Sequence, residues 1–262
     1  MNSLRLYCLL GGLSLLVCHP TRAATNATFR VMTYNIHHGE GVDGKVDLER
    51  IATVITNAGA DLVALQEVDR GVRRTQGRDL PAELARLTGL TCVFSNNFAY
   101  QGGEYGNAIL SRFPILSATN TLYRMLRPEE QRGLLQAVVR VAERELVFAV
   151  THIDYRPDEA ERLTNVFEIH GLFAATRRPV LLCGDFNATP DSRTHARMKE
   201  RFTDAWELVG QGKGFTITSD KPRKRIDYQW LNTGAPLRPL KAWIPETTAS
   251  DHLPLVMEWE WR

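Results

Sequence analysis

The sequence of 262 residues predicts one α/β domain with a functional site at one edge of its sheet. Short apolar runs such as Val180 to Leu182 have the length and composition of buried strands. A helical pattern from Leu48 to Ile55 lies between two such runs, and a strand, a helix and a strand in this order form a right-handed parallel crossover. Polar residues repeatedly follow the predicted strands. Ligands of α/β proteins bind at the edge where such strands end.

The first 23 residues have the pattern of a secretory signal peptide. Arg5 precedes an apolar run from Leu6 to Val17, which is too short to span a bilayer comfortably, and small residues follow at Ala23 and Ala24. We therefore expect cleavage after Ala23, a folded domain over residues 24–262, and a secreted or periplasmic destination. A retained N-terminal membrane anchor is the alternative.

Cleavage would leave 30 basic and 30 acidic side chains, because it removes Arg5 and Arg22 and no acidic residue. A formally neutral chain lacks the broad basic surface with which many proteins bind nucleic acid, although a local basic patch stays open. Two cysteines remain, Cys92 and Cys183, and both lie in apolar, strand-like runs. We expect two buried free thiols rather than a disulfide, although the spacing alone leaves both states open.

The residues from Phe29 to Asn35 alternate in the manner of a strand, and a polar, glycine-rich turn follows them. This turn contains His37 and His38. Neighbouring side chains on an extended segment point to opposite faces, so the two histidines are a poor pair for one metal ion. A metal site, a surface position and a contact to a substrate are the alternatives for them.

A helix is predicted from Asp47, a favourable N-cap, to Gly59. The segment from Asp61 to Gln66 is typical of a second buried strand, and Glu67 follows it. The parallel crossover brings Asn35 and Glu67 to the same edge of the sheet. We therefore expect both side chains in the functional site.

Four arginines lie in the next loop, and two of them are candidates for binding a phosphate group. Solvated basic loops are common, but Arg73 and Arg74 could also hold a phosphate with paired hydrogen bonds. The expected elements that follow are a helix from Leu80 to Leu87, a strand from Thr91 to Ser95, a polar glycine-rich loop and a strand from Asn107 to Ser111. Tyr105 and Asn107 lie where the loop meets that last strand.

The middle of the chain predicts a hairpin, a helix and a buried strand. Strands from Leu134 to Val141 and from Glu145 to Val150 flank a short turn. His152 and Asp154 follow the second strand and face the same side of an extended segment. A helix from Asp158 to about Ala175 leads to the strand at Val180.

A tight turn at Gly184 follows this strand and presents Asp185 and Asn187 together. An aspartate can accept a proton from water or bind a hard metal ion, and an asparagine amide can hold an oxygen atom. The alternative is that both residues only cap the turn between the strand and the next helix.

The last third of the chain contains a second candidate pair. A short helix from Asp191 to Glu200 and a basic, irregular loop from Lys213 to Arg225 precede a strand that carries Asp227. Asp251 and His252 lie just before a final alternating strand. Because Asp227 is available to orient the imidazole of His252, an acid or base role for this histidine is favoured over an exposed turn position.

Seven short segments in this order resemble the endonuclease/exonuclease/phosphatase superfamily, which includes pancreatic-type deoxyribonucleases, abasic-site endonucleases, neutral sphingomyelinases and inositol-phosphate phosphatases. They lie between Thr33 and Pro254 and are TYN, LQEV, YGNAILSR, THID, GDFN, RIDY and SDHLP. Each segment is weak alone, but seven in the right order are a specific signal. The resemblance implies a four-layer α/β sandwich, in which two mixed β-sheets pack face to face with helices outside.

The resemblance also implies a divalent metal ion, usually Mg²⁺ with Mn²⁺ as an option, held chiefly by Glu67 with Asn35 and Asp251 nearby. Magnesium agrees with a set of oxygen ligands. The predicted substrate contacts are Asn107, Tyr105, Arg73 and Arg74.

The catalytic roles follow from the same resemblance. Asp185 and Asn187 would orient the attacking water, and His252, paired with Asp227, would act on the water or on the phosphoryl group. His152 would stabilise the pentacoordinate phosphorane or protonate the leaving oxygen. His252 is the predicted base, and Asp185 is the alternative.

We therefore expect a secreted, divalent-metal-dependent phosphodiester hydrolase. The segment PRKRIDYQW departs from the pattern of the inositol-phosphate branch, and abasic-site endonucleases are intracellular proteins with basic loops that bind DNA. The neutral charge favours a lipid headgroup or another small phosphodiester over DNA or RNA. The segments YNIHHGEGVDGKVDLERI and EVDRGVRRT resemble an exported branch related to lipid-remodelling proteins of glycosylphosphatidylinositol anchors.

Two other functions stay open. One is a secreted endonuclease that acts on DNA or RNA, and the other is a catalytically silent homologue that uses the sandwich as a binding module. The second is disfavoured because no acid or histidine position of the pattern is lost. The expected partners are the phosphodiester substrate and either a membrane lipid surface or a nucleic acid, and the expected state is a monomer without a protein partner.

Overall fold

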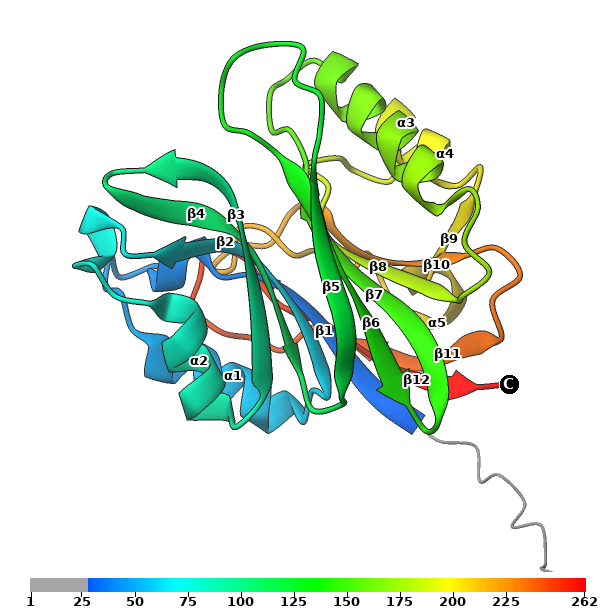
Figure 1. Ribbon diagram of the computed structural model, residues 1–262, viewed down its shortest axis with the longest axis horizontal. Helices are drawn as coiled ribbons and strands as arrows, with labels where there is room; N and C mark the ends of the chain where they lie inside the picture. Colours follow the sequence, from blue (N-terminus) through cyan, green and yellow to red (C-terminus); the bar gives the residue numbers. More distant parts are fainter. Residues whose placement is uncertain (1–27) are drawn as a thin grey trace, which may run out of the picture.

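Two six-stranded β-sheets form the centre of the molecule in the computed structural model, which describes residues 28–262 (Figure 1). The predicted signal peptide, residues 1–23, lies outside the described residues. The first sheet has the strand order β11 (Leu237–Trp243), β12 (Leu255–Trp261), β1 (Thr28–Asn35), β2 (Leu62–Arg70), β4 (Gly103–Ser111) and β3 (Thr91–Tyr100). The second has the order β5 (Ile115–Leu122), β6 (Gly133–Val141), β7 (Arg144–His152), β8 (Val180–Asp185), β10 (Asp227–Asn232) and β9 (Phe202–Asp204).

Each sheet is mixed, because it contains one parallel pair of neighbouring strands. In the first sheet this pair is β1 and β2, and the helix α1 (Leu48–Ala58) connects them as the sequence predicts. Asp47 accepts a hydrogen bond from the backbone N–H of Arg50 at 3.0 Å, and Gly59 ends the helix in the left-handed conformation. In the second sheet the parallel pair is β7 and β8, which α3 (Ala160–Phe173) connects.

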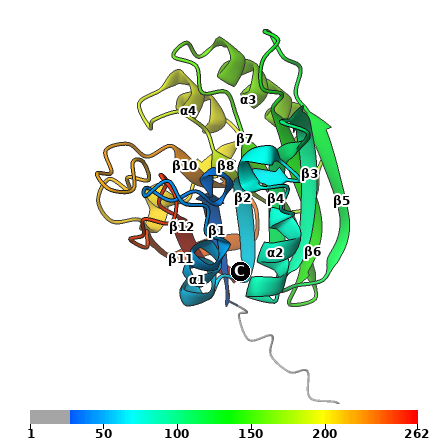
Figure 2. The ribbon, with the colours of Figure 1, turned by 90° about the vertical axis from the view of Figure 1, so that its left-hand side faces the viewer.

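The two sheets pack face to face and bury one hydrophobic core between them. This core includes Phe29 and Trp259 from the first sheet and Leu135 and Phe148 from the second, all at most 2% exposed. The outer face of the first sheet packs against α1 and α2 (Leu80–Thr88), and that of the second against α3 and α4 (Arg193–Met198) (Figures 1 and 2). The layers form because each sheet buries apolar side chains on both of its faces. The predicted four-layer α/β sandwich is confirmed.

A hairpin replaces the polar loop that the sequence predicts between β3 and β4. The two strands pair around Gln101 and Gly102, which both have a positive φ, as tight hairpin turns require. Phe98 and Tyr105 meet across the strands with ring centroids 5.1 Å apart. Cross-strand aromatic contacts of this kind stabilise a hairpin even where its other residues are polar.

Several further elements lack a strong local pattern in the sequence and are not predicted from it. The strand β5 is polar and mostly exposed, and its antiparallel pairing with β6 holds it at the edge of the sheet. The others are the strands β9 and β11, the helix α5 (Trp206–Val209), and the short 3₁₀ helices η1 (His37–Gly39) and η2 (Arg73–Thr75).

Both described cysteines are free thiols, as predicted, with Cys183 buried and Cys92 partly buried. Within residues 28–262, no helix is long and apolar enough to cross a membrane.

A buried ionic cluster stabilises the edge of the second sheet around Asp204, the last residue of β9. Its Oδ2 accepts hydrogen bonds from His195 Nε2 at 2.9 Å and from Arg225 Nη1 at 2.7 Å. Its Oδ1 accepts one from the backbone N–H of Trp206 at 3.0 Å. Burial raises the pKa of Asp204, but the hydrogen bonds and charges of His195 and Arg225 outweigh burial, so the pKa lies below its usual value.

We expect Asp204→Asn to lower the free energy of unfolding at neutral pH by about 3 kcal/mol, because Arg225 then stays buried without its charged partner. The stabilisation from a carboxylate with a lowered pKa is present above the pKa of the unfolded state, about 3.9, and disappears as the pH falls through the lower folded-state value. Urea unfolding at pH 7 and at pH 3 measures both effects. A difference between wild type and variant that is equally large at both pH values would contradict this assignment.

A close approach of β7 and β8 requires glycine at position 184. Gly184 lies opposite Thr151 in the parallel pair and has a φ of +153°. A Cβ atom at this position would lie 2.0 Å from the carbonyl oxygen of Thr151, so no side chain fits without separating the two strands.

We expect Gly184→Ala to lower the free energy of unfolding by about 1–3 kcal/mol, the usual range for overpacking. Gly171→Ala is the matched control, because a Cβ at Gly171 in α3 meets no atom within 4 Å and alanine is favoured in helices by up to about 1 kcal/mol. Thermal unfolding measures both. Equal midpoints for the two variants would show that β7 and β8 tolerate a side chain here.

Candidate active site

Neighbouring strands of the second sheet bring three candidate residues into one row. The register pairs Asp185, the last residue of β8, with His152, the last residue of β7. On its other side Asp185 pairs with Asp227, the first residue of β10. The row therefore depends on the pairing of three strands and not on a loop.

Asp185 is the centre of this cluster. Its Oδ2 accepts a hydrogen bond from Asn35 Nδ2 at 3.1 Å and lies 3.5 Å from His152 Nε2 and 3.7 Å from His252 Nε2. Its Oδ1 accepts a hydrogen bond from the backbone N–H of Asn187 at 2.8 Å. Burial and the charge of Asp227 raise the pKa of Asp185 to about 7, against the opposing effect of His252 and of the two hydrogen bonds.

His252 forms a buried pair with Asp227. Its Nδ1 lies 2.9 Å from Asp227 Oδ2. Burial alone would lower the pKa of His252, but Asp227, together with Asp185 and Asp251, raises it to about 10. The imidazole is then cationic at neutral pH, and a cationic ring has no lone pair with which to accept a proton. The cationic state of His252 and the raised pKa of Asp185 favour Asp185 as the proton acceptor.

His152 and Asn187 form the neighbouring part of the cluster. Asn187 Nδ2 lies 3.0 Å from His152 Nε2 and donates a second hydrogen bond to the carbonyl oxygen of Ile153 at 3.1 Å. Burial, Arg132 and His252 hold the pKa of His152 well below its usual value. The ring is therefore neutral and accepts the amide N–H at Nε2, which leaves its proton on Nδ1.

The sequence predicts Glu67 at the end of the second strand. In the structure Glu67 lies inside β2, which continues to Arg70. The pairing of β2 with β4 shifts between Leu65 and Val68, and Glu67 has a φ of 57°. A β-bulge of this kind re-aims a side chain. Here it directs Glu67 toward β1, where its Oε1 accepts a hydrogen bond from Asn35 Nδ2 at 2.9 Å.

A cavity of about 220 Å³ opens beside the cluster and has both cationic and aromatic walls. Arg74 binds both carboxylate oxygens of Asp69 at 2.8 Å, and its guanidinium lies over the ring of Tyr105. Arg132 is only 3% exposed and pairs with Glu130. The lining residues are Glu67, Arg74, Phe98, Tyr100, Tyr105, Glu130, Arg132, His152, Tyr155, Asp185, Asn187 and His252.

Two of the predicted substrate contacts do not line this cavity. Arg73 is exposed on η2, and Asn107 is buried and donates a hydrogen bond to the carbonyl oxygen of Gly133 at 3.3 Å. Asn107 thereby holds the residue that follows Arg132. Arg132 and Tyr155 are not predicted from the sequence, because neither lies in a recognisable motif and each reaches the cavity only through the assembled sheet.

The residues around Glu67 fit a divalent cation. Glu67 and Asp251 are partly exposed carboxylates, and Asp251 Oδ1 lies 4.0 Å from His37 Nδ1. Asn35 Nδ2 donates hydrogen bonds to Glu67 and Asp185, and its Oδ1 accepts one from the backbone N–H of His37 at 3.0 Å. Carboxylates suit a divalent ion, and Asn35 positions Glu67 through its amide N–H while its oxygen keeps a second lone pair.

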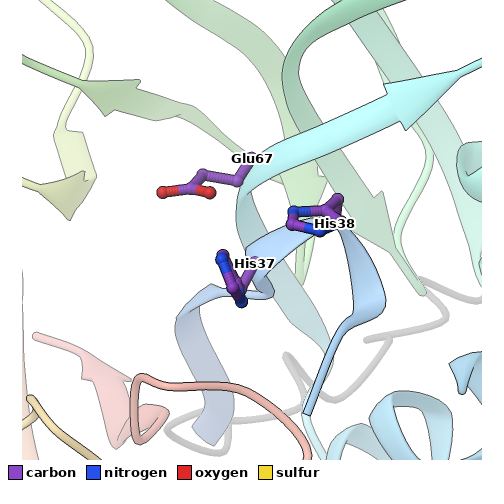
Figure 3. Close-up of side chains that lie close together, drawn as sticks. All are labelled: His37, His38 and Glu67. Atoms are coloured by element: carbon purple, nitrogen blue, oxygen red, sulfur yellow. The ribbon is translucent and has the colours of Figure 1, made fainter. Parts of the chain in front are cut away.

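The turn after β1 brings His37, His38 and Glu67 together (Figure 3). Both histidines have a positive φ, 44° and 45°, and their ring centroids lie 4.4 Å apart. One ligand atom from each of the three residues lies within 4.8 Å of the others. The prediction that the two histidines point to opposite faces is therefore wrong, because the segment turns in the left-handed conformation instead of extending.

Comparisons with known proteins agree with this architecture. The protein is 27% identical over 252 residues to YbhP of Escherichia coli strain K12, an uncharacterized protein, with 88% of this chain and 96% of the relative covered. Its fold is similar to that of an endonuclease/exonuclease/phosphatase from Beutenbergia cavernae, with a TM-score of 0.75, 23% identity, and 89% and 72% of the two chains covered. It is also similar to a mannosyl-6-phosphatase of Bacteroides thetaiotaomicron, with a TM-score of 0.71, 16% identity, and 88% and 99% covered.

The model of the endonuclease/exonuclease/phosphatase family matches residues 32–252. This range contains all the residues of the cluster, from Asn35 to His252. Enzymes of the family are hydrolases of phosphoesters and use divalent metal ions. The chain belongs to the endonuclease/exonuclease/phosphatase family.

Proposed function

We propose that the protein is an exported, divalent-metal-dependent phosphodiester hydrolase whose substrate is a lipid headgroup or another small phosphodiester. The observation that carries this proposal is the convergence of Asp185, His252 and His152 with two arginines on one small cavity. Export is supported by the N-terminal apolar run, Leu6 to Val17.

The arrangement meets the main electrostatic need of the reaction. A phosphodiester is an anion that repels a nucleophile, and the negative charge on its oxygens must be stabilised in the transition state. A divalent ion near Glu67 would supply part of this stabilisation. Arg132 and the cationic ring of His252 supply positive charge from the protein itself, at buried positions where it is little screened.

The remaining residues handle the water and its proton. Asn187 and Asp185 are hydrogen-bonded to each other, and in the proposed mechanism they orient the attacking water. Asp185 accepts its proton, since its pKa is about 7, and His252 holds the phosphoryl oxygen. His152 lines the same cavity and acts on the leaving oxygen or on the phosphorane.

The size and surroundings of the cavity support a small or lipid-borne substrate. A volume of about 220 Å³ lies below the usual 300–1,000 Å³ of small-molecule sites, so it suits a phosphate with a small group. The connection between β5 and β6 contributes Arg132 to the cavity and exposes Leu126, and Leu122 is exposed at the end of β5. Exposed apolar side chains on the segment that supplies Arg132 support a lipid surface as the setting of the substrate. The resemblance to lipid-remodelling proteins also predicts a lipid substrate, and it stays a prediction.

A nuclease acting on flexible single strands is the second candidate. Phe98, Tyr100 and Tyr105 form an aromatic wall of the cavity. Aromatic side chains of this kind stack on nucleobases, with about 1–3 kcal/mol for each base. A monomer is proposed for either activity.

The test is hydrolysis of a substrate panel by wild type, Asp185→Asn and His252→Ala with Mg²⁺ or Mn²⁺. The panel contains a bis-aryl phosphodiester, an aryl phosphomonoester, sphingomyelin vesicles, a single-stranded oligonucleotide and supercoiled plasmid. We expect phosphodiester or sphingomyelin cleavage that falls at least about 100-fold in both variants. Asp158→Asn, which changes an exposed aspartate outside the cavity, is the matched control and should keep wild-type activity.

Each contrary outcome has one meaning. Cleavage of the oligonucleotide or plasmid alone, lost in Asp185→Asn, would replace the lipid proposal by a nuclease. No cleavage of any panel substrate by folded protein would contradict the proposed hydrolase and favour the silent binding homologue.

Arg132 should determine how tightly the anionic substrate is held. We expect Arg132→Gln to lower kcat/KM at least about 10-fold, because the substrate loses a charged hydrogen-bond donor in a buried setting. Arg86→Gln, at an exposed position on α2, is the control and should change kcat/KM less than about 2-fold. Steady-state kinetics with the bis-aryl phosphodiester measure both. Equal effects of the two substitutions would exclude Arg132 from substrate binding.

A further inference from the structure

We propose that His37, His38 and Glu67 bind one divalent transition-metal ion of the manganese, iron or zinc type in preference to Mg²⁺. The proposal rests on the proposed function, because it identifies the ion of the same site. It departs from the sequence-based expectation in its ligands, since two of the three are nitrogen donors.

The first support is the geometry of the turn. Both histidines lie in η1 with left-handed backbone conformations, so their rings stand beside each other at an interplanar angle of 64°. Glu67 reaches the same point from the bulge in β2 (Figure 3). The helix η1 and the strand β2, which α1 separates in the sequence, thus bring three potential metal ligands to one place.

The distances between the ligand atoms suit one ion. The three atoms lie within 4.8 Å of one another. Ligands about 2.1 Å from a common ion lie about 3–4 Å apart. His37 and Glu67 are partly exposed, so rotation of their side chains can close this small difference without disturbing the core.

The second support is an unpaired buried atom. His38 is only 5% exposed, and within residues 28–262 its Nδ1 has no hydrogen-bond partner. Its Nε2 lies 3.5 Å from Glu40 Oε2, which is beyond a good hydrogen bond. A buried imidazole nitrogen without a partner costs stability, and a bound metal ion is one way to satisfy it.

The chemistry of the donor set decides the class of ion. Two imidazoles and one carboxylate leave several coordination positions open for water and substrate, a set typical of catalytic zinc and non-haem iron sites. Magnesium prefers oxygen ligands in a near-ideal octahedron. Asp251 Oδ1 lies 4.0 Å from His37 Nδ1 and adds negative charge beside the three ligands.

The test is metal binding by the full chain without any substrate, with Mn²⁺ as the probe. Electron paramagnetic resonance measures free Mn²⁺ during a titration and during competition with Mg²⁺, and spin-echo spectra of the bound ion report coordinated histidine nitrogen. We expect nitrogen couplings in wild type, and half-displacement of Mn²⁺ only at a Mg²⁺ excess of at least about 10-fold.

His37→Asp is the decisive variant, because it replaces a nitrogen donor by an oxygen donor at a partly exposed position. We expect weaker nitrogen couplings and a preference for Mn²⁺ over Mg²⁺ that falls at least about 10-fold. His170→Gln is the matched control, since His170 lies on α3 outside this cluster, and it should keep the wild-type spectrum and preference. Thermal unfolding verifies that both variants are folded.

The outcomes separate this proposal from the proposed function. Bound Mn²⁺ without nitrogen couplings, no binding of Mn²⁺, or an unchanged preference in His37→Asp would overturn the His37, His38 and Glu67 site, even if the protein hydrolyses phosphodiesters. Nitrogen couplings that weaken in His37→Asp, in a protein that cleaves no phosphoester, would support the metal site and overturn the proposed function.

Discussion

The pairing of β8 between β7 and β10 is the constraint on which the site depends. It buries Asp185 between His152 and Asp227, in a row set by strand register. The absence of a side chain at Gly184 lets β7 and β8 approach closely beside this row. Burial makes the carboxylate of Asp185 costly to ionise, and His252 and the hydrogen bond from Asn35 partly compensate. The fold therefore gives the carboxyl of Asp185 a pKa of about 7, at which it can accept and release a proton at neutral pH.

The first sheet contributes the opposite side of the site through two local departures from regular structure. A bulge turns Glu67 out of β2, and a left-handed turn brings His37 and His38 together. Asn35 links the two sides, because its amide donates hydrogen bonds to both Glu67 and Asp185. Backbone strain at functional sites is common, since the surrounding structure has to maintain it. Here the two packed sheets provide that support.

Much of this arrangement is predictable from the sequence, because it follows from local patterns and one topological rule. The apolar strands, the capped helix α1 and the parallel crossover together bring Asn35 and Glu67 to one edge. The turn at His37 is different. Its conformation depends on distant contacts, such as the hydrogen bond from Ser250 Oγ to the carbonyl oxygen of Asn35 at 2.8 Å. Arg132 likewise reaches the cavity only after β5 and β6 have paired, which no local pattern indicates.

Asp185 Oδ2 lies 3.7 Å from His252 Nε2, and each residue shifts the pKa of the other. The central claim is therefore that the two act as one catalytic unit, and the most direct measurement is a double-mutant cycle. It compares kcat/KM for wild type, Asp185→Asn, His252→Ala and the double variant with the best substrate of the panel. Residues that act as a unit have grossly non-additive effects. The account predicts that the double variant is impaired about as much as the worse single variant. Losses that multiply in the double variant would contradict it and would mean that the two residues contribute independently.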